Sequence, residues 1–299
     1  CKNVLADNTQ AEKLQNAVKA FYLYYKAADE YFNVIDLSTV TGNIVVQNSG
    51  VITGTLSGNH KISIADGATV RLRNANITSL ANDEYYVKYA GITLLGDATI
   101  LLEGTNTVKG GYKSYPGIYV PEGKTLTIDG NGSLVASSQG YACGIGGGAG
   151  IRCGNITIDG GNITATGGVR AAGIGGGNDT SCGDITINGG TVTATGGEGA
   201  AGIGSGRYKN ASCGNITITG GTVTATGGES ATGIGTGAFQ ASCGNITIAN
   251  TVTQVTATKG TGFALENSIG KSRGCTCGTV TIGGVVGAVS ESPYTYRPE

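Results

Sequence analysis

The sequence lacks Trp and Met, contains one His, and has few charged residues, which make up 13% of the chain. No nucleophile motif lies near the single His, His60, so a Ser-His-Asp arrangement is not expected. The net charge is −1 and no basic stripe is present, which argues against a nucleic-acid partner. No run of eighteen apolar residues occurs, so no transmembrane span is predicted.

Glycine is abundant, with 55 residues among 299, and aromatic residues are few. Such a composition is also found in disordered chains. The sequence argues against disorder because Ile and Val alternate strictly with polar residues. In the segment NITI, Ile156 and Ile158 point to one side while Asn155 and Thr157 point to the other. This period of two predicts half-buried strands.

A near-identical segment recurs roughly every thirty residues. It reads CGNITIDGGNITATGG from Cys153, CGDITINGGTVTATGG from Cys182 and CGNITITGGTVTATGG from Cys213, with a drifting copy from Cys243. Repetition at this period is typical of a solenoid, because one unit cannot bury its apolar face alone. GG pairs between the strands supply the corners. We therefore predict an all-β fold, a right-handed parallel β-helix of eight or nine coils.

The N-terminal segment differs from the rest, since Gly is absent until Gly42. Thr9 and Glu12 fit a capping box, and apolar residues follow at helical spacing. We predict two domains: residues 1–33, with a short α-helix that caps the solenoid, and residues 34–299, the β-helix. A docking helix for a partner is the alternative.

Five cysteines occupy the same place in successive repeats and predict a ladder: Cys153, Cys182, Cys213, Cys243 and Cys277. Because side chains of in-register neighbours run parallel, we expect buried thiols rather than disulfides. Cys143 stands where later repeats have Ala172 and Ala201, which favours a packing role. Zinc is not expected, since the only His is distant from Cys275 and Cys277.

Two carboxylates are weak candidates for calcium or for acid–base chemistry. Asp129 and Asp159 align in adjacent coils before a GG corner. Later copies have Asn188 and Thr219 there, so ordinary turn residues are the alternative. Apart from possible calcium, no cofactor is expected. A further polar ladder, through side-chain amide stacking, is predicted for Asn155, Asp184, Asn215 and Asn245.

Tyrosines gather in the loops of two adjacent coils, together with two acidic residues: Tyr85, Tyr86, Tyr89, Tyr112, Tyr115, Asp83 and Glu84. Exposed Tyr rings stack on sugar faces, so this edge is a candidate polysaccharide-binding site. The alternative is that the rings cover the coil edge as a small local core. An enzymatic cleft would have to come from the same loops, around Asp83, Glu84, Lys88, Lys113 and Glu122.

Several segments carry a family likeness: GTLSGNHKISIADGATVRL, the AGIGGG…CGNITITGGTVTATGG repeats and the closing SPYTYRP. Over residues 34–299 the chain resembles exported β-helix proteins of gut Bacteroidales and some Firmicutes. The resemblance implies a pectate-lyase-like fold and a role as a surface adhesin or carbohydrate-binding protein. It implies no catalytic residues.

These observations together predict a non-catalytic binding or adhesion protein on the bacterial cell surface. The expected partner is a polysaccharide or a surface glycan of host or bacterial origin. Cys1 is the expected lipid-attachment residue of an outer-membrane lipoprotein, and a bridge from Cys1 to another subunit is the alternative. The second hypothesis is a structural protein that self-assembles end to end. The third is a polysaccharide lyase or glycoside hydrolase.

Overall fold

The structure is a computed structural model that describes residues 33–78, 89–111, 114–262 and 266–298. Its contacts divide the chain into the units Cys1–Val34 and Ile35–Glu299. The predicted N-terminal helix, with Thr9 and Glu12, and the candidate lipid-attachment residue Cys1 lie outside the described residues.

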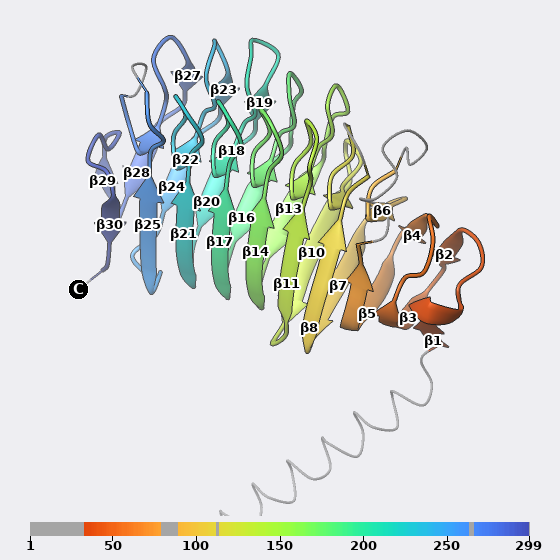
Figure 1. Cartoon of the computed structure of the whole chain (residues 1–299). Coiled ribbons are helices and arrows are strands. Elements are labelled where there is room, and N and C mark those ends of the chain that lie inside the picture. Colours follow the sequence, from red (N-terminus) through yellow and green to blue (C-terminus); the bar gives the residue numbers. More distant parts are fainter. Residues whose placement is uncertain (1–32, 79–88, 112–113, 263–265, 299) are drawn as a thin grey trace, which may run out of the picture. The chain divides into compact units, whose positions relative to one another are not determined.

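The unit Ile35–Glu299 is a parallel β-solenoid, in which each coil adds a strand to three rows (Figure 1). The first row contains β3 (Ser49–Thr55), β5 (Ala68–Ile77), β7 (Ala98–Glu103), β10 (Thr125–Gly130), β13 (Asn155–Ile158), β16 (Ile185–Ile187), β20 (Ile216–Ile218), β24 (Ile246–Ile248) and β28 (Val280–Ile282). The second row starts with the paired ends of β3 and β5 and continues with β8 (Thr105–Lys109), β11 (Ser133–Ser137), β14 (Asn162–Thr166), β17 (Thr191–Thr195), β21 (Thr222–Thr226) and β25 (Gln254–Thr258). With β1 (Asn33–Asp36), β29 (Val285–Val286) and β30 (Tyr294–Tyr296), these rows form one sheet of 18 described strands.

The third row is a separate parallel sheet, to which nine successive coils each contribute one described strand. Its members are β2 (Ile44–Val46), β4 (Ile62–Ile64), β6 (Ile92–Leu94), β9 (Ile118–Tyr119), β12 (Ile145–Gly146), β15 (Ile174–Gly175), β18 (Ile203–Gly204), β22 (Ile234–Gly235) and β26 (Ile269–Gly270). A small sheet in the loops contains β19 (Ser212–Cys213), β23 (Ser242–Cys243) and β27 (Thr276–Cys277), and one 3-10 turn, η1, spans Leu37–Thr39. The predicted all-β parallel β-helix is confirmed.

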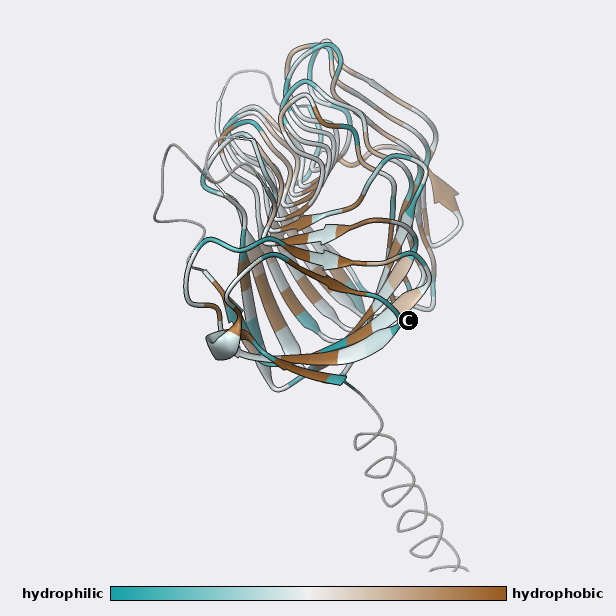
Figure 2. Ribbon diagram, turned by 90° about the vertical axis from the view of Figure 1, so that its right-hand side faces the viewer, coloured by the Kyte–Doolittle hydropathy of each residue, from teal (hydrophilic) through white to brown (hydrophobic). Residues whose placement is uncertain are grey.

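The core is made of identical aliphatic residues stacked in register. Ile156 pairs with Ile185, which in turn pairs with Ile216, and all three are fully buried. The intervening Thr157 and Thr186 also pair, on the outer side. Figure 2 is viewed along the axis of the solenoid and shows the resulting apolar bands on the stacked strands. Each buried Ile stabilises the fold by about 1.5–3 kcal/mol, and a slip of one residue would expose the whole column.

The predicted polar ladder is present, but it bonds differently from the expected amide stacking. Asn155 Oδ1 accepts a hydrogen bond from the Asp184 backbone N–H at 2.9 Å, and Asp184 Oδ1 accepts one from Asn215 N–H at 2.7 Å. Asn215 and Asn245 continue the series. Because the acceptor is a side-chain oxygen and the donor is backbone, Asp serves as well as Asn. The ladder ties each coil to the next.

The cysteine ladder is also present, but the prediction that all its members are unbridged is wrong. Cys153 and Cys182 form a disulfide with a Cα–Cα distance of 4.4 Å. Neither residue belongs to a named strand, whereas Cys213, Cys243 and Cys277 lie in β19, β23 and β27. Parallel pairing holds side chains side by side, while a corner lets two of them converge. Cys213 and Cys243 stay buried free thiols, and the free thiol of Cys277 is half-buried.

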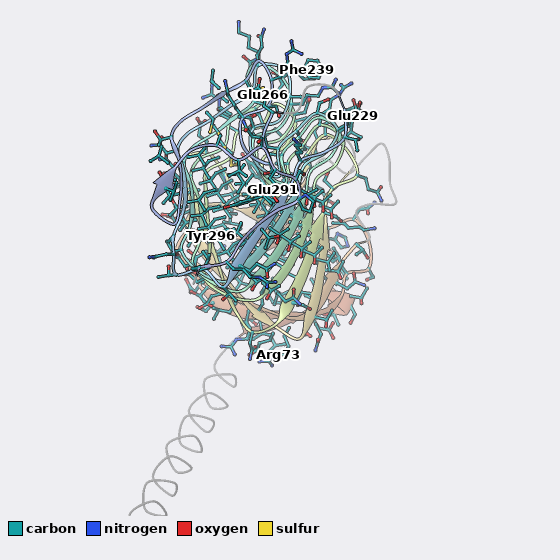
Figure 3. All side chains as sticks on the ribbon, turned by 90° about the vertical axis from the view of Figure 1, so that its left-hand side faces the viewer. Arg73, Glu229, Phe239, Glu266, Glu291 and Tyr296 are labelled. Carbon is teal, nitrogen blue, oxygen red and sulfur yellow. A yellow bond between two sulfur atoms is a disulfide. The ribbon has the colours of Figure 1, made fainter. Side chains whose placement is uncertain are left out.

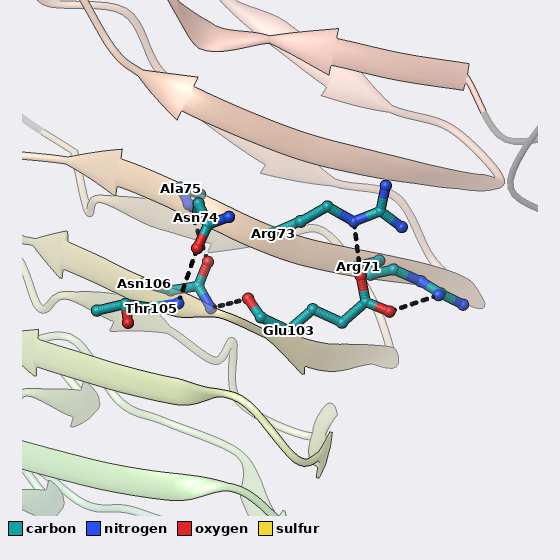
Figure 4. A network of polar contacts seen from close by, with 7 residues as sticks. All are labelled: Arg71, Arg73, Asn74, Ala75, Glu103, Thr105 and Asn106. Carbon is teal, nitrogen blue, oxygen red and sulfur yellow. Dashed lines mark hydrogen bonds and ion pairs between the residues drawn. The ribbon is translucent and has the colours of Figure 1, made fainter.

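A partly buried polar network stabilises the bulge at which β5 passes from the first row to the second (Figure 4). Glu103 accepts hydrogen bonds from Arg71 Nη1 at 2.7 Å and from Arg73 Nε at 2.6 Å. Fully buried Asn106 accepts one from the Ala75 N–H and donates to the carbonyls of Glu103 and Ser133. Later coils have aliphatic residues at this place, so the polar side chain here serves the bulge.

The C-terminal end closes all three rows with antiparallel segments. β29 (Val285–Val286) pairs with β28, β30 (Tyr294–Tyr296) pairs with β25, and Val289 bridges to Ile269 of the third row. The two tyrosines of β30 pack against the core. Antiparallel closure replaces the parallel edge that a further coil would extend.

Candidate functional site

Two sets of loops meet along one side of the solenoid. The loop after the second row of one coil contacts the loop after the third row of the next coil, because the third-row strands between them are mostly two residues long. Four backbone hydrogen bonds join the sets: Ala149 to Ser114, Asn178 to Tyr141, Arg207 to Arg170, and Ala238 to Gly199. We call this surface the loop seam.

A tyrosine-lined pocket of about 140 Å³ lies near the N-terminal part of the seam. It is lined by Lys61, Tyr89, Ala90, Thr93, Tyr115, Tyr119 and Ile151. The Tyr89 hydroxyl donates to the Asn59 carbonyl, and the Tyr119 hydroxyl donates to the Arg152 carbonyl at 3.2 Å. Burial, and then the nearby charge of Glu122, raise the pKa of Tyr119, so its hydroxyl stays a donor. Three tyrosines and one lysine therefore line a single small pocket.

The structure brings together two of the tyrosines predicted from the sequence and adds a third. Tyr89 and Tyr115 line the same pocket, with Tyr119 of β9 beside them. The other candidates, Asp83, Glu84, Tyr85, Tyr86 and Tyr112, lie outside the described residues. Tyr119 was missed, although the motif PGIYV marks it as the one aromatic residue at a position that later coils fill with Gly. Tyr89 also packs partly against the core, as in the alternative interpretation.

Further along the seam, arginines alternate with aromatic rings. The Arg170 guanidinium lies 5.7 Å from the Tyr141 ring centroid and 5.4 Å from that of Tyr208. Arg207 lies 5.1 Å from the Tyr208 centroid and 4.4 Å from that of Phe239. Figure 3 shows Phe239 at the outer margin of the loops, on the side of the coil opposite Arg73. We call these five residues the arginine–aromatic row.

Three members of this row have an unfavourable backbone conformation. Arg170, Tyr208 and Phe239 have φ angles of 64°, 86° and 62°. The stacked loop positions in other coils include glycines, Gly199 for Arg170 and Gly150 for Tyr208 and Phe239. A left-handed conformation costs a bulky residue about 1–2 kcal/mol. The side chains are therefore kept at a cost to stability, which is typical of functional positions.

The two arginines of the row differ in whether a carboxylate neutralises their charge. Arg207 forms an ion pair with Glu198. Arg170 forms no ion pair with any carboxylate in the described part of the chain, and its buried Nε lacks a hydrogen-bond partner there. Asn178 Oδ1, from the adjoining loop, is likewise buried without a partner. Among the described residues, the row thus presents one cation without a carboxylate partner, which lies between two tyrosine rings.

The calcium candidates are engaged in local hydrogen bonds. Asp129 Oδ1 accepts from the Gly130 N–H at 2.7 Å, and Asp159 Oδ1 accepts from Asn188 Nδ2 at 2.8 Å. Within the ranges that the structure describes, no group of three or more His, Cys, Asp or Glu side chains is arranged to hold a metal ion. Glu122, from the proposed enzymatic cleft, forms an ion pair with Arg152 at 3.0 Å.

A larger polar pocket of about 420 Å³ lies among the loops after the third row, near the disulfide. Its lining includes Arg152 and a single carboxylate, Asp179. Asp179 accepts two hydrogen bonds from Asn210, at 3.1 and 3.2 Å. A lone carboxylate with this partner lacks the second acid that glycoside hydrolysis requires.

The repeats match a known family model. A model described as a beta helix repeat matches residues 156–178, 185–207 and 216–238. The chain is a β-helix repeat protein. No curated protein and no solved structure gives a significant match. None of the described helices of this β-helix repeat protein is long and apolar enough to cross a bilayer.

Proposed function

We propose that this β-helix repeat protein is a non-catalytic binding or adhesion protein that recognises polysaccharide along the loop seam. The observation that carries the proposal is the pocket in which Tyr89, Tyr115 and Tyr119 surround a space of about 140 Å³ beside Lys61. Aromatic rings give a flat apolar platform for the C–H face of a sugar, while Tyr hydroxyls and an ammonium group bond its hydroxyls.

The solenoid suits a binding role because it repeats the same loop contact in coil after coil. Recognition groups on successive coils are spaced by the strand separation, about 4.8 Å. An extended polymer lying along the seam meets several of them, and weak contacts add up to useful affinity. We propose a location at the bacterial cell surface on the basis of the sequence resemblance.

End-to-end assembly is the second candidate, and the C-terminal closure weighs against it. β29 and β30 occupy the places where a further parallel coil would pair. Exposed Val285 and Val286 remain on β29, at 72% and 69% exposure, as the apolar surface that such assembly would use.

Enzymatic activity is the third candidate function. Calcium dependence is examined in the binding test, which is run with calcium and with chelator.

Affinity electrophoresis against plant, mucin and bacterial polysaccharides, with calcium and with chelator, tests the proposal. Tyr115→Ala removes one ring from the pocket and should weaken binding about fivefold, corresponding to about 1 kcal/mol. Tyr115→Phe is the matched control, since it keeps the ring and removes only the hydroxyl, and should bind more tightly than Tyr115→Ala. If no polysaccharide is retained, or if Tyr115→Ala is retained like Tyr115→Phe, the proposed pocket is wrong.

A further inference from the structure

We infer that the arginine–aromatic row binds an anionic glycan, with the Arg170 guanidinium holding a carboxylate or sulfate group between Tyr141 and Tyr208. The inference rests on the proposed function and names the class of ligand. Sugars that carry such a group combine the two chemistries this surface offers, a flat C–H face for the rings and an anion for the guanidinium.

Arg170 is the residue suited to the anion. The described carboxylates leave its charge uncompensated, whereas Glu198 neutralises Arg207. A guanidinium is planar and donates paired hydrogen bonds that match the two oxygens of a carboxylate or sulfate. The flanking rings hold the guanidinium in place through cation–π contacts, so little conformational freedom is lost on binding.

The surroundings supply accessible contact area. Tyr141 is 38% exposed and Phe239 is 53% exposed, while Val169, next to Arg170, is 41% exposed. Lys209 is exposed next to Tyr208 and adds a second cation in the same loop. The cation–π contacts between described residues all lie in this row.

The backbone gives an independent argument. Arg170 and Tyr208 both hold left-handed conformations at stacked positions where the next coil has Gly199 and a coil two steps away has Gly150, respectively. Glycine would relieve the strain, so a purely structural loop would favour it. The chain instead keeps a cation and a ring there, side by side across the seam.

The same strain provides a variant that should fold well. Arg170→Gly reproduces the residue of the next coil at this position and should not lower stability. We expect this variant to lose about tenfold or more in affinity for an anionic polysaccharide. Arg170→Lys keeps the charge without the planar donors and should retain part of the affinity. Arg273→Gln, at an exposed arginine in the last coil, is the matched control for loss of one charge and should bind as the parent does.

The experiment measures dissociation constants for four polymers in the presence of chelator, with each variant. Polygalacturonate carries carboxylates, dextran sulfate carries sulfates, dextran is neutral, and polyglutamate is anionic without sugar rings. The inference expects saturable binding of polygalacturonate or dextran sulfate, sensitive to salt and to Arg170→Gly, and much weaker binding of polyglutamate. Whether polygalacturonate or dextran sulfate binds identifies the preferred anion as a carboxylate or a sulfate.

Three results would overturn the inference that this row binds an anionic glycan. Equal binding of polyglutamate would show a general anion site, in which the rings contribute nothing. Unchanged affinity of Arg170→Gly would remove the guanidinium from the site. Binding of neutral dextran alone, sensitive to Tyr115→Ala, would refute this inference and leave the proposed function intact, whereas failure of every glycan would refute both.

Discussion

Cys153 and Cys182 occupy equivalent positions in successive coils, and their sulfur atoms are bonded to each other. The bond joins two coils at a corner, with 29 residues of sequence separation. It is followed along the same column by thiols that are not bonded, Cys213, Cys243 and Cys277. In this column of cysteines, the first two residues are covalently bonded, and the later ones are free thiols.

Removal of this disulfide should destabilise the solenoid. Cys153→Ala with Cys182→Ala is expected to lower the free energy of unfolding by about 2–4 kcal/mol, because the cross-link restricts the unfolded chain. Chemical denaturation measures the loss. A non-reducing tryptic digest should yield residues 153–170 linked to residues 171–207, since cleavage follows Arg152, Arg170 and Arg207. Finding those two peptides unlinked in protein kept under oxidising conditions would contradict the assignment.

Asn106 should not tolerate an aliphatic substitute, although aliphatic residues fill its position in later coils. Asn106→Leu fits the space but leaves the Ala75 N–H and two carbonyls unpaired. Each buried unpaired group costs about 1–3 kcal/mol, so unfolding should occur at clearly lower denaturant concentration. Ile163→Leu, two coils further along the same column, is the control and should cost less than about 1.5 kcal/mol. Equal midpoints for the two variants would show that the network contributes nothing.

Fold and site differ in how far the sequence predicts them. The alternation in NITI determines which residues face inward, so the strands, the register and the core follow from it directly. The role of Asn106 cannot be predicted from this alternation, because its partner Ala75 lies at a bulge in β5 that no local sequence pattern marks. The disulfide depends on how a corner orients two side chains, which a repeat pattern does not contain.

The arginine–aromatic row was missed for a related reason. Arg170 and Arg207 stand in different loops of different coils, and only the seam hydrogen bond brings them together. From the sequence, Tyr141 and Tyr208 are expected only to lie near the coil edge that carries the tyrosine-bearing loops. A usable signal was present, since Arg170 replaces the glycine that the next copy has at this position. The C-terminal closure likewise looks like another coil until Gly283 and Gly284 turn the chain back.

Glycines of the third row and of the loops that follow it should differ sharply in their tolerance of a side chain. Gly204 has a φ angle of 137°, and a Cβ atom there would overlap the Gly235 carbonyl oxygen of the next coil. Gly204→Ala should therefore cost several kcal/mol or prevent folding. Gly150→Ala is the matched control, because its φ angle of 64° is also positive but its surroundings are open. It should cost only about 1–2 kcal/mol. Thermal unfolding followed by circular dichroism compares the two, and similar melting temperatures would argue against close stacking of the coils.

The polar ladder should distinguish the side-chain oxygen from the charge. Asp184→Asn keeps the oxygen that accepts the Asn215 N–H and should leave stability nearly unchanged, as Asn fills the equivalent position in neighbouring coils. Asp184→Ala removes the acceptor and should cost about 1 kcal/mol. Denaturant midpoints measured at neutral pH separate the two outcomes. A larger loss for the Asn variant than for the Ala variant would show that charge, and not the oxygen, is what this position needs.

Cys143 should make the solenoid sensitive to alkaline pH. Burial raises the pKa of its thiol from the ordinary 9.0 to about 12. The folded state therefore favours the protonated thiol, and this contribution is fully present below the unfolded pKa and is lost as the pH rises toward the folded one. Cys143→Ala places in this coil the residue found at Ala172 and should fold. Between about pH 8 and about pH 11, its melting temperature should fall less steeply than that of the parent. Parallel curves would show that the thiol does not contribute, since the other buried thiols and tyrosines titrate alike in both proteins.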